Sequence, residues 1–177
     1  MIIVFEGHDR SGKSSISRAL SEKLHTTRFK MERVDRFWDP HINLRYVVDG
    51  LLQLFEQTKM PIIIDRWIPS DYVYGKLFNR DVNQATLDKY DERMVKLNTL
   101  YIHCFKDVSE FIVDEEDKDL HTPADYPRMI EYYNEYFKTR TKCPCLELNT
   151  SSQNLEEQLE LIMNAIIKYK HEDTRNI

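Results

Sequence analysis

Short, continuous apolar runs that alternate with stretches of helical periodicity are the feature that most constrains the fold. Each run has the length of one strand, and a strand that is apolar at every position must be buried on both faces. The runs occupy residues 2–5, 61–65, 100–105 and 145–148, residues 29–34 are a further candidate strand, and helical patterns occupy residues 14–24, 42–57 and 153–170. We therefore predict an α/β fold with a five-stranded parallel sheet flanked by helices. Ligands of such sheets bind beyond the carboxyl ends of the strands.

Length and composition indicate a single domain without an extended surface for nucleic acid. The chain has 177 residues and fits one domain, which we place at residues 1–171, and the polar residues 172–177 are expected to fray. The formal net charge is −5, so binding to polymeric nucleic acid is not expected. Cys104, Cys143 and Cys145 form neither a disulfide framework nor a paired zinc motif, which favours the cytoplasm. No apolar run reaches the length of a signal peptide or a membrane helix, so no membrane association is expected.

The residues directly after the first apolar run match a phosphate-binding motif. Gly7, Gly12, Lys13 and Ser14 fit the pattern G-x-x-x-x-G-K-[ST], between a buried strand and an amphipathic helix. Glycines let successive backbone N–H groups point at a phosphate, and the helix N-terminus adds positive potential. The lysine supplies a cation to the β- and γ-phosphates, and the serine hydroxyl can ligate Mg²⁺. The motif predicts a site for ATP and Mg²⁺ formed by Gly7, Arg10, Ser11, Gly12, Lys13, Ser14 and Ser15; the alternative is a glycine turn with an incidental Lys-Ser pair.

A second pair of charged residues ends the apolar run at residues 61–65. Asp65 could hold Mg²⁺ together with Ser14, and the adjacent Arg66 is suited to binding a second phosphate bidentately. The alternative is a strand-end ion pair without a catalytic role. Because a phosphate loop is expected on a neighbouring strand, we favour the functional interpretation.

Together these two stretches resemble a known family. The segment FEGHDRSGKSS is similar to the thymidylate kinase phosphate loop, F/L-E-G-x-D-x-x-G-K-[ST]. The segment DRWIPSDYVY is similar to the D-R-Y/F-x-x-S-x-x-A-Y/F stretch of the same family, with Ser70 and Tyr74 at matching positions. The two motifs cover 21 residues, and the order of strands and helices along the whole chain agrees with that family.

The resemblance implies a role for each matching residue. Asp9 corresponds to the acid that approaches the 3′-hydroxyl of the acceptor sugar, and Arg66 to the arginine that holds the acceptor 5′-phosphate. Arg10 corresponds to a loop arginine of one subgroup, which reaches the transferring phosphoryl group. Ser70 and Tyr74 would complete the acceptor site. Dimers are common in the family, so a homodimer is possible.

The chain also departs from the family pattern. The expected lid, residues 107–126, contains no arginine and one lysine, Lys118, so Arg10 would have to supply the charge that a lid arginine supplies elsewhere. The family's F-P-x-R element is altered here, and Arg36 and Phe37 stand in that region as candidates for binding phosphate and stacking on a base.

The sequence therefore predicts phosphoryl transfer from ATP to a nucleotide substrate. The favoured acceptor is deoxythymidylate or a related pyrimidine deoxynucleotide, with Lys13, Arg10, Asp65 and Arg66 as the catalytic residues. One alternative is a kinase of a nucleoside or another small hydroxyl compound, in which Asp65 would act as the base. Another is a nucleotide-binding switch without an acceptor.

Overall fold

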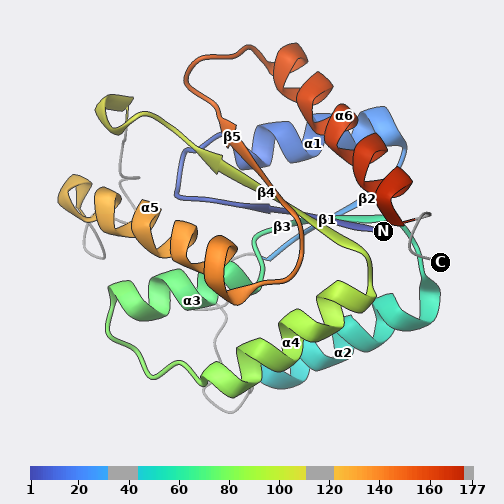
Figure 1. The fold of residues 1–177 in the computed structure, drawn as a ribbon, viewed down its shortest axis with the longest axis horizontal. Helices are drawn as coiled ribbons and strands as arrows, with labels where there is room; N and C mark the ends of the chain where they lie inside the picture. The colour runs from blue at the N-terminus through green and yellow to red at the C-terminus, as the bar shows by residue number, and fades with distance from the viewer. Residues whose placement is uncertain (32–43, 111–121, 174–177) are drawn as a thin grey trace.

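The computed structural model of the protein describes residues 1–31, 44–110 and 122–173. Its centre is a five-stranded, wholly parallel sheet with the strand order β2-β3-β1-β4-β5 (Figure 1). The strands are β1 (Ile2–Glu6), β2 (Thr27–Lys30), β3 (Ile62–Asp65), β4 (Thr99–Phe105) and β5 (Cys145–Asn149). The predicted fold class is confirmed.

The parallel register brings the sequence motifs to one edge of the sheet. On one side of β1, Phe5 pairs with Asp65 of β3; on the other side, Glu6 pairs with His103 of β4. The phosphate loop after β1 and the Asp65-Arg66 pair at the end of β3 therefore lie beside one another. The two segments are close because β1 and β3 are neighbouring strands in the sheet.

Helices cover both faces of the sheet. Helices α1 (Lys13–Leu24) and α6 (Leu155–Asp173) cover one face, and the opposite face carries α2 (Leu44–Thr58), α3 (Ile68–Leu77), α4 (Gln84–Lys96) and α5 (Tyr126–Glu135) (Figure 1). Alternate β1 residues enter the two cores: Ile3 and Phe5 pack under α1 and α6, while Ile2 and Val4 face the other layer. Burial on both faces explains why β1 is apolar at every position up to Glu6.

The second strand differs from the sequence-based expectation of residues 29–34. It begins at Thr27 and ends at Lys30, with the register Thr27–Ile62 to Lys30–Asp65. An edge strand pairs on one side only and is partly exposed, so polar residues are accepted there and no continuous apolar run marks it. Residues 32–34 of the predicted strand lie outside the described residues.

Helical boundaries agree with the periodicity where it was strong. The C-terminal helix begins at Leu155 and continues to Asp173, which is two residues into the tail that was expected to fray. Neither α3 nor α4 was delimited from the sequence. Helix α3 is buried on most sides and has no clear apolar stripe.

Candidate functional site

The phosphate loop is shaped by three residues with positive φ. Gly7 has φ 138°, Arg10 has φ 57° and Gly12, the N-cap of α1, has φ 83°. A Cβ atom on Gly7 would lie 1.9 Å from the carbonyl oxygen of Cys104 in β4, so only glycine fits there. The loop thus packs directly on the neighbouring strand, and it leads into the first turn of α1, where Ile16 N–H donates to Gly12 O at 3.0 Å.

Lys13, at the first position of α1, lies over this loop. Its ammonium donates to the carbonyl oxygen of His8 at 2.6 Å, and the side chain is buried. Burial, followed by the nearby charge of Arg66, lowers the pKa of Lys13 to about 8. Because burial disfavours the charged form of Lys13, an anion that enters the loop would be stabilised by its ammonium group and would stabilise it in turn.

Ser14 and Asp65, the two predicted metal ligands, are brought together. Ser14 Oγ donates to Asp65 Oδ2 at 2.7 Å. Asp65 Oδ1 is buried and has no hydrogen-bond partner within the described part of the chain. In that same part, no three His, Cys, Asp or Glu side chains gather as metal ligands. A serine hydroxyl and one spare carboxylate oxygen suit Mg²⁺, which takes most of its ligands from water and phosphate.

Arg28 of β2 is an unpredicted member of this group. Its guanidinium forms an ion pair with Asp65 Oδ2, and its Nε donates to Ser17 Oγ of α1 at 2.8 Å. Arg28 therefore places a second positive charge beside the Ser14–Asp65 contact. In the sequence, Arg28 is one charged residue in a short edge strand, and hydrophobic periodicity does not indicate that it contacts Asp65.

Arg66 points back from the end of β3 toward the phosphate loop. Its guanidinium forms an ion pair with Asp9 and donates to Gly7 O at 3.2 Å. Tyr74 OH of α3 donates to Asp9 Oδ2 at 3.3 Å, and Ser70 Oγ lies 3.4 Å from Arg66 Nη1. Four residues that the two motifs singled out, from the loop, the strand end and α3, therefore form one cluster.

The remaining predicted residues occupy different positions. Arg10 is exposed, as is Ser15, whereas Ser11 is buried within the loop. Arg36 and Phe37 lie outside the described residues, as do residues 111–121 of the predicted lid.

His8 joins the phosphate loop to both ends of that predicted lid. The backbone N–H of Lys106, which follows β4, lies 3.2 Å from His8 Nε2, and Tyr126 OH, at the start of α5, lies 3.1 Å from it. Burial lowers the pKa of His8 to about 4, so the imidazole is neutral at pH 7. Lys106 and Tyr126 are distant from His8 in the chain, so these partners could not be identified from the sequence.

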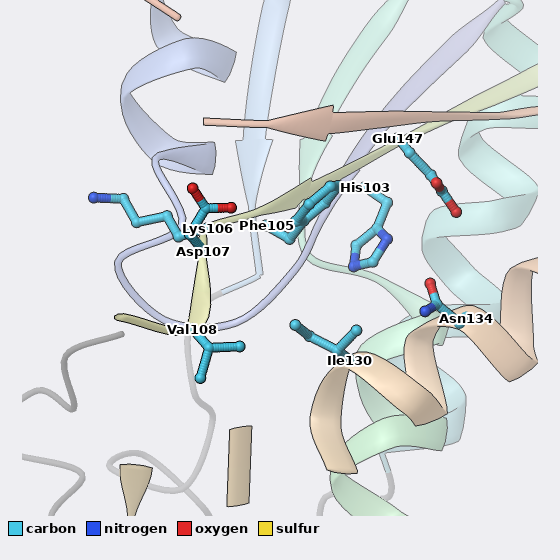
Figure 2. A pocket seen from close by; sticks show the side chains of 8 residues that line it. All are labelled: His103, Phe105, Lys106, Asp107, Val108, Ile130, Asn134 and Glu147. Carbon is cyan, nitrogen blue, oxygen red and sulfur yellow. The ribbon is translucent and has the colours of Figure 1, made fainter. Parts of the chain in front are cut away.

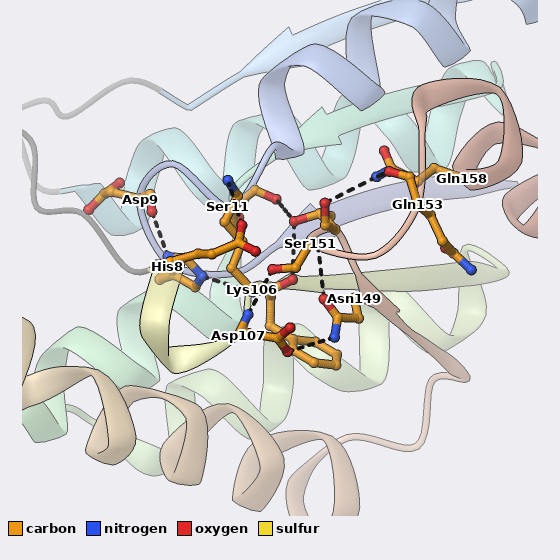
Figure 3. A network of polar contacts seen from close by, with 12 residues as sticks. His8, Asp9, Ser11, Lys106, Asp107, Asn149, Ser151, Gln153 and Gln158 are labelled. Atoms are coloured by element: carbon orange, nitrogen blue, oxygen red, sulfur yellow. Dashed lines mark hydrogen bonds and ion pairs between the residues drawn. The ribbon is translucent and has the colours of Figure 1, made fainter.

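A second polar network supports the loop from the side of β5 (Figure 3). Thr150 Oγ1 donates to Ser11 O at 2.9 Å, and Thr150 N–H donates to Phe105 O at 2.8 Å. Asp107 N–H donates to Ser151 Oγ at 2.9 Å, and Asn149 Nδ2 donates to Asp107 Oδ1 at 3.0 Å. The loop between β5 and α6 therefore fixes the phosphate loop relative to the end of β4.

A cavity of about 220 Å³ lies on the α5 side of β4 and β5 (Figure 2). Its lining residues are His103, Phe105, Lys106, Asp107, Val108, Ile130, Asn134 and Glu147. Asp107 and Val108 of this lining stand in the predicted lid. Lys106 N–H contacts His8 and Asp107 N–H donates to Ser151, so the cavity borders the network that supports the phosphate loop.

Comparison with known proteins gives similarity in structure but not in sequence. No protein-family model matches the chain, and no curated protein sequence does. The YorR protein from Bacillus subtilis, solved in complex with phosphorylated GDP, superimposes with a TM-score of 0.75 at 19% identity, covering 97% of this chain and 98% of that one. Thymidylate kinase from Candida albicans gives a TM-score of 0.62 at 16% identity, with 96% and 92% covered. Deoxyadenosine kinase from M. mycoides, solved with the products dCMP and dCDP, gives 0.60 at 21%, with 95% and 100% covered.

The chain has the thymidylate kinase-like P-loop kinase fold. These similarities extend over nearly the full length of each chain, so the kinase fold covers the described sheet and its helices. Within the described ranges, no helix has both the length and the apolar character needed to cross a bilayer.

Proposed function

We propose that this protein transfers the γ-phosphoryl group of ATP to a nucleoside monophosphate, with deoxythymidylate or a related pyrimidine deoxynucleotide as acceptor. The observation that carries the proposal is the position of Arg66, whose guanidinium is bonded to Gly7 and Asp9 of the phosphate loop. An acceptor phosphate bound to Arg66 would lie beside the phosphates of the donor. The similar solved structures include thymidylate and deoxyadenosine kinases, which supports a nucleotide or nucleoside acceptor.

Catalysis in such a site rests on positioning and charge. Lys13 and the N-terminus of α1 would bind the donor phosphates, while Arg66 would hold the acceptor phosphate in line. Arg10, exposed at the rim of the loop, would stabilise charge on the transferring group. Asp9 and Tyr74, joined by a hydrogen bond, would contact the sugar, with Ser70, Arg36 and Phe37 as further acceptor contacts.

Ser14 and Asp65 would hold Mg²⁺, which when bound neutralises charge on the β- and γ-phosphates. Arg28 would keep Asp65 oriented through their ion pair. The nucleoside-kinase alternative would use Asp65 as the base. Because Asp65 lies against Ser14, the other predicted metal ligand, and keeps Oδ1 unbonded within the described residues, its position favours the metal role.

The test is incubation of the purified protein with Mg²⁺ and γ-labelled ATP against nucleosides and nucleoside monophosphates, ribo and deoxy. We expect label in a pyrimidine deoxynucleotide. Arg66→Ala should lower kcat/KM for that acceptor by about 100-fold, because about 3 kcal/mol of charge-assisted hydrogen bonding is lost.

Arg140→Ala is the matched control, since Arg140 forms its ion pair with Asp88, away from the phosphate loop. Label on nucleosides only, with Asp65→Asn inactive and Arg66→Ala active, would establish the hydroxyl kinase instead. ATP binding without transfer to any acceptor would establish the nucleotide-binding switch.

A further inference from the structure

Glu6, the last residue of β1, is a fully buried carboxylate that stands in the phosphate-loop motif but has no role in the site described above. Its Oε1 accepts from the backbone N–H of Trp67 at 2.5 Å, and its Oε2 accepts from the hydroxyl of Ser70 at 2.6 Å. Burial raises the pKa of Glu6 to about 7. A buried acid is unfavourable unless its hydrogen bonds are needed, so the groups that Glu6 binds indicate its purpose.

The first of those groups belongs to a strained turn. Arg66 has φ 69°, the left-handed region that is unfavourable for any residue with a side chain. Its own N–H donates to Phe5 O at 2.9 Å, and the next N–H, that of Trp67, donates to Glu6. The last two residues of β1 therefore bind two successive N–H groups of the turn and hold it in this conformation.

The second group lies against the guanidinium that the turn directs. Ser70 Oγ gives its proton to Glu6 and so presents a lone pair to Arg66 Nη1, 3.4 Å away. Tyr133 OH lies 3.3 Å from the same oxygen and limits where Ser70 can move. Glu6 thus acts on both the backbone and the side chain of Arg66 without touching its guanidinium.

We propose that Glu6 is the positioning residue of Arg66: it fixes the left-handed turn after β3 and orients Ser70, so that the guanidinium faces the phosphate loop. This assignment rests on the proposed function, in which Arg66 binds the acceptor phosphate. It predicts that loss of Glu6 weakens binding of the acceptor nucleotide and leaves binding of ATP unaffected.

The experiment compares Glu6→Met, which has no acceptor atoms of comparable strength, with Glu6→Gln, which keeps a carbonyl oxygen for Trp67 N–H. For Glu6→Met we expect the KM for deoxythymidylate to rise about tenfold or more, with the KM for ATP changed less than about twofold. Glu6→Gln should restore most of the acceptor affinity. Unchanged KM values in a folded Glu6→Met protein would overturn the assignment.

Asp91→Leu provides the matched control for a merely structural role. Asp91 is also a buried carboxylate, and it accepts from Thr141 Oγ1 at 2.5 Å and Lys142 N–H at 3.2 Å, away from the phosphate loop. Its loss should lower the Tm without changing either KM. An acceptor KM raised equally by Asp91→Leu would overturn the assignment of Glu6.

A crystal structure of Glu6→Met separates this proposal from the proposed function. The proposal requires residue 66 to leave the left-handed region and the Arg66–Asp9 contact to break, whatever the protein phosphorylates. A retained turn and contact would overturn it even if the kinase activity is found. Should Glu6→Met fail to fold, Ser70→Ala replaces it in the crystal structure: the Arg66 guanidinium should move away from Gly7 O while residue 66 keeps its left-handed conformation through the Trp67–Glu6 bond, and an unmoved guanidinium would count against the proposal.

Discussion

Replacement of Gly7 by alanine should distort the phosphate loop more than the same replacement of Gly12. The added Cβ would lie 1.9 Å from Cys104 O, a backbone atom of a central strand. Because carbon–oxygen contacts are normally no shorter than about 3.3 Å, the loop and β4 would have to separate by roughly 1.4 Å. Alanine is also strained at φ 138°.

We expect Gly7→Ala to lower the free energy of unfolding by about 2–6 kcal/mol, combining about 1–3 kcal/mol of strain with about 1–3 kcal/mol of overpacking. Urea unfolding followed by circular dichroism measures this change, and calorimetric titration with ATP measures binding. Since the loop separates from the strand, ATP binding should be lost even where the variant remains folded.

Gly50→Ala in α2 is the matched control. No atom lies within 4 Å of a Cβ at Gly50, and the residue sits inside a helix, so alanine should stabilise the protein by about 0.5–1 kcal/mol. A Gly7→Ala protein that unfolds like wild type and binds ATP normally would refute the packing argument.

Three further predictions concern charge. Glu6→Gln removes a carboxyl group whose pKa is about 7 in the folded protein and 4.5 ordinarily. As the pH rises from 4.5 to 7, the wild type should therefore lose about 3 kcal/mol of unfolding free energy relative to the variant. Urea unfolding at several pH values measures this difference, and an equal pH dependence of the two proteins would contradict it. ATP affinity should fall, approaching tenfold per pH unit above about pH 8, as Lys13 loses its proton, whereas Lys13→Arg should be insensitive to pH there in the same calorimetric titration. Asp9→Asn should bind inorganic phosphate about fivefold more tightly, because the ion pair that competes for Arg66 is worth about 1 kcal/mol; weaker binding in a folded variant would be evidence against that competition.

The central strands of the sheet could be predicted from the local sequence. Ile2–Phe5 and Ile62–Ile64 are apolar at every position because both faces of β1 and β3 are covered, and this pattern is visible without a structure. The predicted bounds of β2 were wrong because a partly exposed edge strand tolerates the polar residues Thr27, Arg28 and Lys30, which no apolar pattern marks. Apolar patterning marks a buried strand better than a half-exposed one.

The site divides in the same way. Lys13, Ser14, Asp65 and Arg66 follow strand ends, so the motifs and the parallel sheet were sufficient to bring them together. Arg28, His8 and Thr150 join the site through contacts with residues distant in the chain, and spacing along the sequence carries no signal of such contacts. Glu6 is visible in the sequence as the acid before Gly7, but nothing there reveals that it binds Trp67 N–H and Ser70.

The ion pair between Asp9 and Arg66 has a consequence for selectivity in a cell rich in free phosphate and sulfate. A small anion that displaces Asp9 from Arg66 leaves that carboxylate beside Tyr74 without its counter-ion. A nucleotide that carries both a phosphate and a sugar hydroxyl can satisfy the arginine and the carboxylate in the same event. In the proposed function, the pair would therefore favour a ligand whose two groups, correctly spaced, replace both contacts that it displaces.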